Sequence, residues 1–394
     1  MRTAGLLFAF AVACVMAVSF AFELPAPTGP LSVSTITLML DRPREPNEAS
    51  RGRFAVQIWY PARPSPDRAP YGSGSPGIKH WIYQRLVRTH TSRGADIADS
   101  PTRFPIIVYV AGWGGERTEN TALSEELASQ GFVVAAFGDV GSDDPPLRRL
   151  GGPADFSSGQ AYGATLRLGH QKLRYAARRA SAVLDRLAIL DAGDSAGRFT
   201  HRLDLSRAGI MGFSFGGAVA LAACRYEPRF KAAMNMDGWL FDAGSGYRGG
   251  TSYFLVSDQA PAPGPDDVNA ADPVRRYTSQ LTVADEALQQ DVLRRGGYSL
   301  LIAGADHFSF TDVPLYAPLH RFSGGPLNSQ RIARAVRNYA VAFFERVLEG
   351  KPSALLVPGN KVDPTMTFAS WPSGRVQTSV VNRSRSYDAD FSRS

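Results

Sequence analysis

The segment from Ala208 to Cys224 constrains the fold of this chain more than any other. A short apolar run leads into Gly-Phe-Ser-Phe-Gly-Gly, and an alanine-rich run follows. This pattern predicts a buried strand, a tight turn carrying Ser214, and a helix. Glycines flank Ser214 because the turn is too sharp for side chains beside it. The turn thus holds the hydroxyl clear of the sheet, at the positive end of the helix. The alternative is an ordinary glycine-rich turn in which Ser214 only caps the helix.

The rest of the chain alternates apolar, strand-like runs with amphipathic, helix-like ones. Strands are predicted at residues 31–40, 54–60, 105–111, 131–137, 230–236, 253–257 and 299–303, and helices at 121–130, 172–190, 285–295 and 332–348. The first two strands are expected to be antiparallel, and residues 63–103 and 138–169 to be long loops. Alternation of this kind predicts an α/β fold with a doubly wound, mostly parallel sheet.

Residues 1–21 have the pattern of a secretory signal peptide. Arg2 supplies a minimal positive region, an apolar run follows, and Ser19-Phe20-Ala21 matches a small-x-small cleavage site. Cleavage after Ala21 would start the mature chain at Phe22 and place it outside the cytoplasm, secreted or periplasmic. A retained membrane anchor is the alternative, although the apolar run is short for a bilayer span.

Beyond the signal peptide we expect one domain over residues 22–350 and a tail over residues 351–394, whose Ser- and Arg-rich end is predicted to be disordered. Only Cys224 remains after cleavage, so an intramolecular disulfide is excluded. The formal net charge is +7, but the arginines are scattered along the chain. This charge pattern favours a solvated surface and gives no support to nucleic-acid binding.

A serine hydroxyl becomes a nucleophile at neutral pH only with a histidine base and an acid that orients the histidine. In a fold with this strand–turn–helix, the chain order is Ser, acid, His. Of the six histidines, only His307 and His320 follow Ser214. His307 comes just after the last predicted strand, at the sheet edge to which Ser214 also points, whereas the apolar, proline-containing surroundings of His320 favour a structural role.

Two aspartates compete for the role of the acid. Asp237 ends the strand after the serine helix, and Asp258 ends the next strand. Both positions lie at the correct edge of the sheet, and topology alone slightly favours Asp258 because the acid commonly follows that later strand. The residues by themselves leave the choice open.

A family resemblance bears on this choice. Residues 214–217, Asp-Gly-Trp-Leu-Phe at 237–241 and Asp-His-Phe-Ser-Phe at 306–310 resemble the plasma-type platelet-activating factor acetylhydrolase family and related bacterial α/β hydrolases. Thr-Gly-Pro at 28–30 and Gln-Ile-Trp-Tyr-Pro-Ala at 57–62 are similar to that family as well. The resemblance implies the α/β-hydrolase fold, and it implies a triad of Ser214, Asp237 and His307, because the family's acid lies in the Asp-x-Trp motif.

Acyl transfer also needs hydrogen-bond donors for the oxyanion. The backbone N–H after the nucleophile, that of Phe215, is one candidate. The second is expected in the Ala-Gly-Trp-Gly-Gly loop at 111–115, where the family's donor maps onto Trp113; a purely structural turn is the alternative. The chain departs from the family at Ala111 and Phe213, where the family usually has histidine, so a more apolar pocket is expected.

The resemblance implies a serine hydrolase that cleaves short-acyl or lipid-like carboxylic esters through an acyl-enzyme, with at most transient contact with a membrane surface. A serine peptidase is an alternative, although no propeller or large gating domain precedes the catalytic region. A non-catalytic binding protein is another, although such a protein would normally have lost a member of the triad. No motif for a metal, a phosphate loop or a dinucleotide occurs in the sequence, so neither metal nor cofactor is expected.

Overall fold

The computed structural model describes residues 22–43, 52–72, 84–138, 154–241, 243, 247, 249–316, 329–359 and 363–371. The predicted signal peptide, His320 and the predicted disordered end of the chain lie outside these residues.

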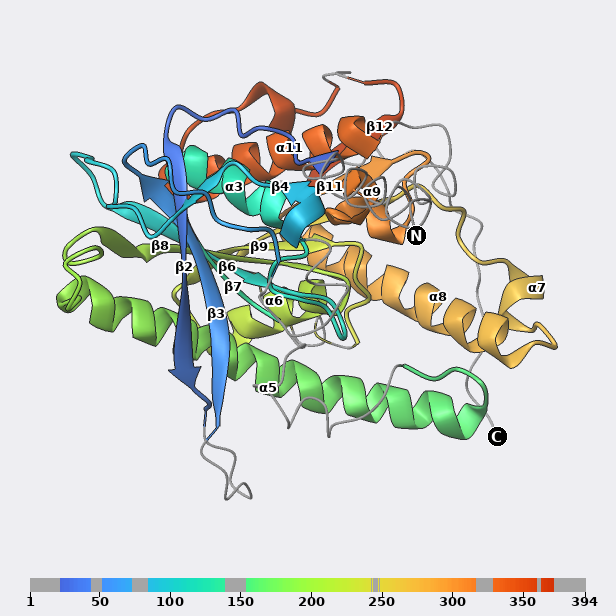
Figure 1. The fold of residues 1–394 in the computed structure, drawn as a ribbon. Helices are drawn as coiled ribbons and strands as arrows, with labels where there is room; N and C mark the ends of the chain where they lie inside the picture. The colour runs from blue at the N-terminus through green and yellow to red at the C-terminus, as the bar shows by residue number, and fades with distance from the viewer. Residues whose placement is uncertain are drawn as a thin grey trace, which may run out of the picture.

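A mostly parallel ten-stranded sheet forms the centre of the molecule (Figure 1). Its strands are β2 (Ser32–Asp41), β3 (Arg53–Ala62), β5 (Thr91–Arg93), β6 (Phe104–Val110), β7 (Val133–Phe137), β8 (Leu203–Phe213), β9 (Phe230–Met236), β10 (Ser252–Asp258), β11 (Gly297–Ile302) and β12 (Met366–Trp371). They lie in the order β12-β11-β10-β9-β8-β6-β7-β3-β2-β5. The strands from β7 to β11 are parallel to their neighbours, while β3 is antiparallel to both β7 and β2, and β12 to β11. The predicted doubly wound sheet, with its antiparallel opening pair, is confirmed.

Helices cover both faces of this sheet. The longer ones are α3 (Thr121–Ser129), α5 (Gly159–Ala192), α6 (Phe215–Tyr226), α8 (Pro273–Arg294) and α11 (Ser329–Glu349). Shorter elements are β1 (Phe22–Glu23), β4 (Val87–Arg88), α7 (Pro265–Val268), η1 (His307–Phe310), α9 (Val313–Tyr316) and η2 (Ala354–Leu356). In Figure 1, α3 and α11 lie above the sheet, and α5 and α6 lie below it.

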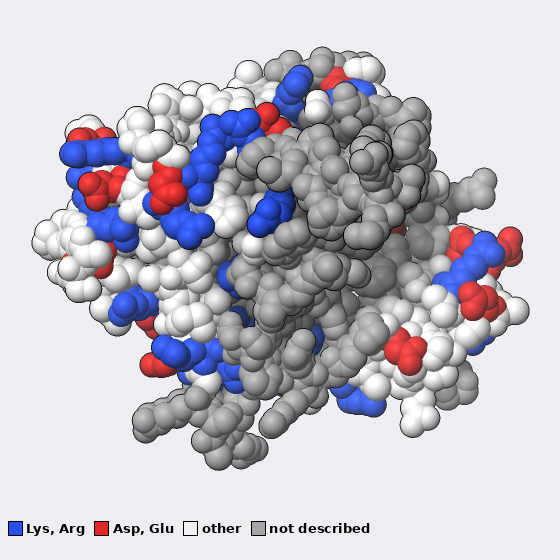
Figure 2. Space-filling view, in the orientation of Figure 1, with Lys and Arg blue, Asp and Glu red and all other residues white. Residues whose placement is uncertain are grey.

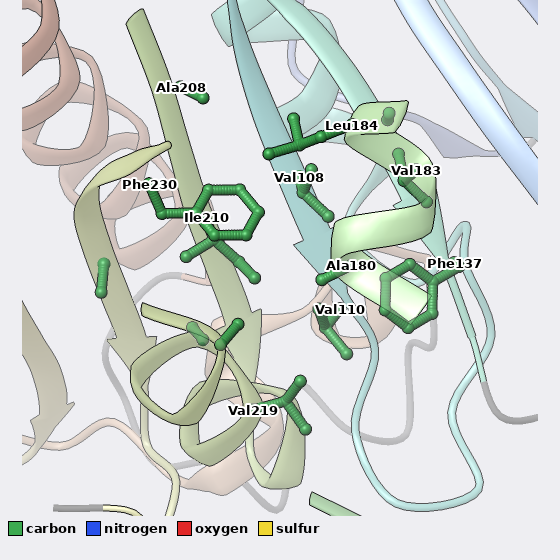
Figure 3. Packing of buried hydrophobic residues seen from close by; sticks show 14 of the residues in the cluster. Val108, Val110, Phe137, Ala180, Val183, Leu184, Ala208, Ile210, Val219 and Phe230 are labelled. Atoms are coloured by element: carbon green, nitrogen blue, oxygen red, sulfur yellow. The ribbon is translucent and has the colours of Figure 1, made fainter. Parts of the chain in front are cut away.

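Strand β6 contributes side chains to the hydrophobic clusters on both faces of the sheet. Successive side chains of a strand point to opposite faces, and here nearly every one is apolar. Val108 and Val110 face α5 and α6, in the cluster shown in Figure 3, where they pack near Ile210 and Val219. Ile107 and Tyr109 face the cluster that α3 and α11 complete on the other side. Because β6 is packed on both faces, its end and the turn that follows it are held in a fixed position.

Two helices begin earlier than the sequence predicted. Helix α5 starts at Gly159 rather than near residue 172, so residues 159–169 are not a loop, and the Ser158 side chain caps it by accepting from the Ala161 N–H. The first turns of α5 were not predicted because they contain glycines, which have a low helix propensity. One of them, Gly169, is required by packing, since a Cβ there would lie 2.9 Å from the Phe241 ring. Helix α8 starts at Pro273 rather than near residue 285, with Asp272 as its cap.

Two segments predicted without strands also contribute to sheets. Residues 63–103 contain β4 and β5, which pair with β1 and β2. Past residue 350, where only a tail was predicted, β12 pairs along all of β11, and Phe368 stacks on Tyr298. The sheet therefore extends beyond the predicted domain boundary.

On the face shown in Figure 2, described charged side chains of both signs are interspersed. At the left edge of Figure 2, basic and acidic side chains are interspersed over the part of the molecule that carries β8 and the end of α5. None of the described helices combines the length and apolar character needed to cross a bilayer.

Candidate active site

Ser214 lies on a strained turn between β8 and α6. Its φ of 52° is in the left-handed region, which a side chain disfavours. Close backbone contacts impose this turn and demand glycine around it: a Cβ on Gly212 would lie 2.2 Å from the Gly216 backbone, and one on Gly216 would lie 2.0 Å from the Val110 carbonyl oxygen. The Ser214 N–H donates to the Met236 carbonyl oxygen at 2.8 Å, which ties the turn to the neighbouring strand.

The turn brings Ser214 to the side chains at the ends of two other strands. His307 begins η1, just past β11, and Asp237 directly follows β9. The Nε2 of His307 lies 3.0 Å from Ser214 Oγ, and its Nδ1 lies 2.6 Å from Asp237 Oδ2. Because an ionised carboxylate only accepts hydrogen bonds, Nδ1 carries the proton toward Asp237 and Nε2 is left to accept from the serine. A continuous chain of hydrogen bonds thus joins the three residues.

Asp237 is itself held from the side opposite His307. Its φ is 57°, and its second carboxylate oxygen accepts from the Ser257 hydroxyl at 2.5 Å. The Asp258 backbone N–H approaches the same oxygen at 3.4 Å. Asp258 therefore contributes its backbone to the site, while the carboxylate that contacts His307 belongs to Asp237. Burial, followed by the nearby Asp237 charge, raises the pKa of the Asp258 carboxyl.

The loop at 111–115 lies beside the serine, as predicted. A Cβ on Gly112 would lie 3.4 Å from Ser214 Cβ, and the Trp113 ring packs edge-on against the Phe215 ring at 5.1 Å. The residue before Trp113 thus lies against Ser214, and Trp113 itself packs on Phe215, the residue after the serine. The Lys172 ammonium, buried on α5, lies 4.3 Å from the centre of the Trp113 ring, within the range of a cation–π contact.

Two phenylalanines lie beside His307. One of them, Phe213, occupies a position at which the family usually has histidine. The Phe213 ring lies 4.7 Å from the His307 ring, and the Phe308 ring lies 5.6 Å from the His307 ring and 6.5 Å from that of Phe213. Phe308 is 48% exposed. These contacts make the surroundings of the imidazole apolar.

Sequence reasoning missed three contributors to this site. Ser257 supports Asp237, Lys172 contacts the Trp113 ring, and Glu119 accepts a hydrogen bond from the Gly112 N–H at 2.8 Å. Ser257 could have been suspected, since it precedes Asp258 at the end of a predicted strand. Lys172 and Glu119 carry no motif, and only the packing of α5 and of the 111–115 loop reveals them. In the described part of the chain, no group of three or more His, Cys, Asp and Glu could hold a metal ion.

Comparison with known families and structures agrees with this geometry. The family "Platelet-activating factor acetylhydrolase, isoform II" matches residues 80–139 and 184–253, which include Trp113, Ser214 and Asp237. The structure resembles that of a ferulic acid esterase from Streptomyces cinnamoneus with a TM-score of 0.65 and 26% sequence identity, over 88% of this chain and 99% of that one. The chain is similar to platelet-activating factor acetylhydrolases and to this esterase. Its fold is the α/β-hydrolase fold.

The similarity to individual acetylhydrolases is partial. The Bos taurus platelet-activating factor acetylhydrolase is 24% identical over 262 residues, which are 56% of each chain. The Cavia porcellus protein is 26% identical over 159 residues, which are 36% of each chain. The chain thus matches little more than half of the length of these relatives, or less.

Proposed function

We propose that this protein is a serine hydrolase that cleaves carboxylic esters through an acyl-enzyme. The observation that carries the proposal is the unbroken hydrogen-bonded series from Ser214 through His307 to Asp237. The names of its relatives, an acetylhydrolase and an esterase, support the same reaction class. All three side chains are present and aligned, which argues for catalysis rather than for binding alone.

In the first half-reaction, Ser214 Oγ attacks the carbonyl carbon of the ester while His307 Nε2 takes the hydroxyl proton. Asp237 keeps the proton on Nδ1 and stabilises the imidazolium that forms. The tetrahedral intermediate collapses as the C–O bond to the alcohol breaks, and the imidazolium returns its proton to the departing alkoxide. Water, activated by the same histidine, then hydrolyses the acyl-enzyme and restores the serine.

The negative charge of each tetrahedral intermediate needs donors in place before the reaction. We assign this role to the backbone N–H groups of Trp113 and Phe215. Their rings are packed against each other, so the loop and the start of α6 are held together. Removing one such donor elsewhere typically costs 10²- to 10³-fold in kcat, which sets the scale for this assignment.

The apolar surroundings favour uncharged acyl groups. Phe213 lies against the histidine, and Phe241 packs against both Trp113 and Phe215. We therefore propose esters with short acyl groups, or lipid-like esters, as substrates. Aromatic acyl esters deserve inclusion in a substrate screen because the structural relative is named as a ferulic acid esterase.

A substrate panel tests the reaction class. p-Nitrophenyl esters of two to twelve carbons, a short-chain phospholipid with an sn-2 acetyl group, methyl ferulate and a peptide p-nitroanilide would be compared by kcat/KM. We expect ester cleavage with a preference for short chains and no turnover of the anilide. Faster cleavage of the anilide than of any ester would support a peptidase instead.

We further propose that the mature protein begins at Phe22 and functions outside the cytoplasm. The support is the charged, apolar and small-x-small pattern of residues 1–21. N-terminal sequencing of protein recovered from the medium or periplasm should start at or near Phe22. Recovery of chains that still carry Met1 in the membrane fraction would support a retained anchor.

A further inference from the structure

Glu119 occupies an unusual place beneath the loop that carries Trp113. One of its carboxylate oxygens, Oε1, accepts from the Gly112 N–H and from the Tyr109 hydroxyl, both at 2.8 Å. The other, Oε2, lies so close to Gly115 that a Cβ there would be 2.2 Å away. The loop therefore wraps around the carboxyl group of a residue that follows it in the chain.

Two further hydrogen bonds hold Glu119 and its partner Tyr109 in place. The Tyr109 hydroxyl, on rigid strand β6, also accepts from the Asn120 side-chain amide at 2.8 Å. The Glu119 carbonyl oxygen accepts from the Asp312 N–H at 2.8 Å, which ties the segment to the stretch just after η1, where His307 lies. Glu119 is thus joined to the sheet, to the start of α3 and to the histidine segment.

We propose that Glu119 is a positioning residue that holds the 111–115 loop in the geometry needed for oxyanion binding. The inference rests on the proposed ester hydrolysis and on the assignment of the Trp113 N–H as an oxyanion donor. The bond to the Gly112 N–H fixes the peptide plane one residue before Trp113. Gly112 also forms the hydrogen bond that closes the turn around Trp113: its carbonyl oxygen accepts from the Gly115 N–H at 2.9 Å. Glu119 itself does not contact substrate.

The function of Glu119 requires an acceptor oxygen rather than a full charge. Burial raises the pKa of its carboxyl group to about 7, although hydrogen bonds from Gly112, Tyr109 and the Glu116 backbone lower it. Near neutral pH, a substantial share of the Glu119 carboxyl groups is therefore protonated and uncharged. An amide, whose oxygen can accept from the same two donors, should replace it with little loss.

Three variants separate positioning from general stability. Glu119→Met removes the acceptor, and Glu119→Gln keeps it. Glu125→Met is the matched control, because Glu125 is a buried carboxylate on α3 that accepts from the His90 N–H at 2.9 Å and from the Thr91 hydroxyl at 2.5 Å, away from the loop. The readouts are kcat and KM for p-nitrophenyl acetate, with folding checked by circular dichroism and thermal unfolding.

For Glu119→Met we expect kcat to fall on the order of 10²-fold while KM changes by less than about threefold, the pattern of a lost transition-state contact. Glu119→Gln should recover most of kcat, and Glu125→Met should keep the wild-type kcat. Wild-type kcat in folded Glu119→Met, or an equal loss in the Gln and Met variants, would overturn the inference.

If Glu119→Met does not fold, Gly115→Ala tests the contact between Glu119 and the Gly112 N–H in another way. The added Cβ would lie 2.2 Å from Glu119 Oε2 and 3.0 Å from the Gly112 nitrogen, so it forces the carboxyl group and the Gly112 N–H to shift while the acceptor stays present. Folded Gly115→Ala should show the same loss in kcat at unchanged KM, and wild-type kcat in it would overturn the inference. Absence of ester turnover by the wild-type protein would contradict the proposed function itself, and with it the inference that rests on it.

Discussion

Replacing Asp237 by asparagine should abolish most of the activity, because the structure dictates how the new amide would be oriented. In the wild-type site, Oδ1 accepts from the Ser257 hydroxyl at 2.5 Å and Oδ2 faces His307 Nδ1 at 2.6 Å. An asparagine would keep its oxygen toward Ser257 and the Asp258 N–H, both of which donate. Its NH₂ group would then point at Nδ1, which must become an acceptor.

The histidine would consequently carry its proton on Nε2, the nitrogen that faces Ser214. It could no longer take the serine proton, and we expect kcat to fall by about 10³ to 10⁴, the loss typical of this tautomer change. The corresponding rise in the activation barrier is about 4 to 5.5 kcal/mol. KM should change little, since Asp237 contacts His307 Nδ1, the ring nitrogen that does not face Ser214. Stopped-flow hydrolysis of p-nitrophenyl acetate would measure both quantities.

Asp258→Asn is the matched control, since its side chain lies next to the site without contacting His307. It should retain kcat within about an order of magnitude, because a nearby charge alone contributes far less than a correct tautomer. Thermal unfolding must show that both variants are folded. Near-normal turnover in Asp237→Asn with collapse in Asp258→Asn would refute the reasoning and assign the acid to the later strand.

Two further predictions concern stability. Gly216→Ala should destabilise the fold by about 1 to 3 kcal/mol or more, because its Cβ would lie 2.0 Å from the Val110 carbonyl oxygen, whereas Gly193→Ala has nothing within 4 Å and should be neutral in urea unfolding. Burial raises the pKa of Asp285 to about 7, so its contribution favours the folded state at low pH and is lost as pH rises from about 4 to 7. The free energy of unfolding of Asp285→Asn minus that of the wild type should therefore be larger at pH 8 than at pH 4. An equal difference at both pH values would contradict this assignment.

Much of this architecture could be predicted because local signals agreed with the fold. Strand β6 is apolar at nearly every position, which is typical of a strand buried on both faces, and its prediction is confirmed. Helix α11 shows a clear helical period and lies where the sequence predicted it. The meeting of Ser214, Asp237 and His307 also follows from the topology of a parallel sheet, because each residue follows a strand and the strands end at one edge.

Other features depend on packing that no local pattern reveals. The first turns of α5 contain Gly159, Gly163 and Gly169, which lower the intrinsic helix propensity, and contacts such as that of Gly169 with Phe241 make them tolerable. Strand β12 is short and separated from the rest of the sheet in sequence, so only its pairing with β11 identifies it. The choice between Asp237 and Asp258 depended on resemblance, since both end parallel strands at the same edge.

The central claim is that Ser214 is the nucleophile, and covalent labelling tests it most directly. Folded protein would be treated with a fluorophosphonate, digested, and analysed by mass spectrometry, with Ser214→Ala and heat-denatured protein as controls. The account predicts one adduct per chain on the peptide that contains Ser214, with no adduct in either control. Labelling at another residue of the folded protein, or ester turnover that persists in folded Ser214→Ala at the wild-type rate, would contradict it.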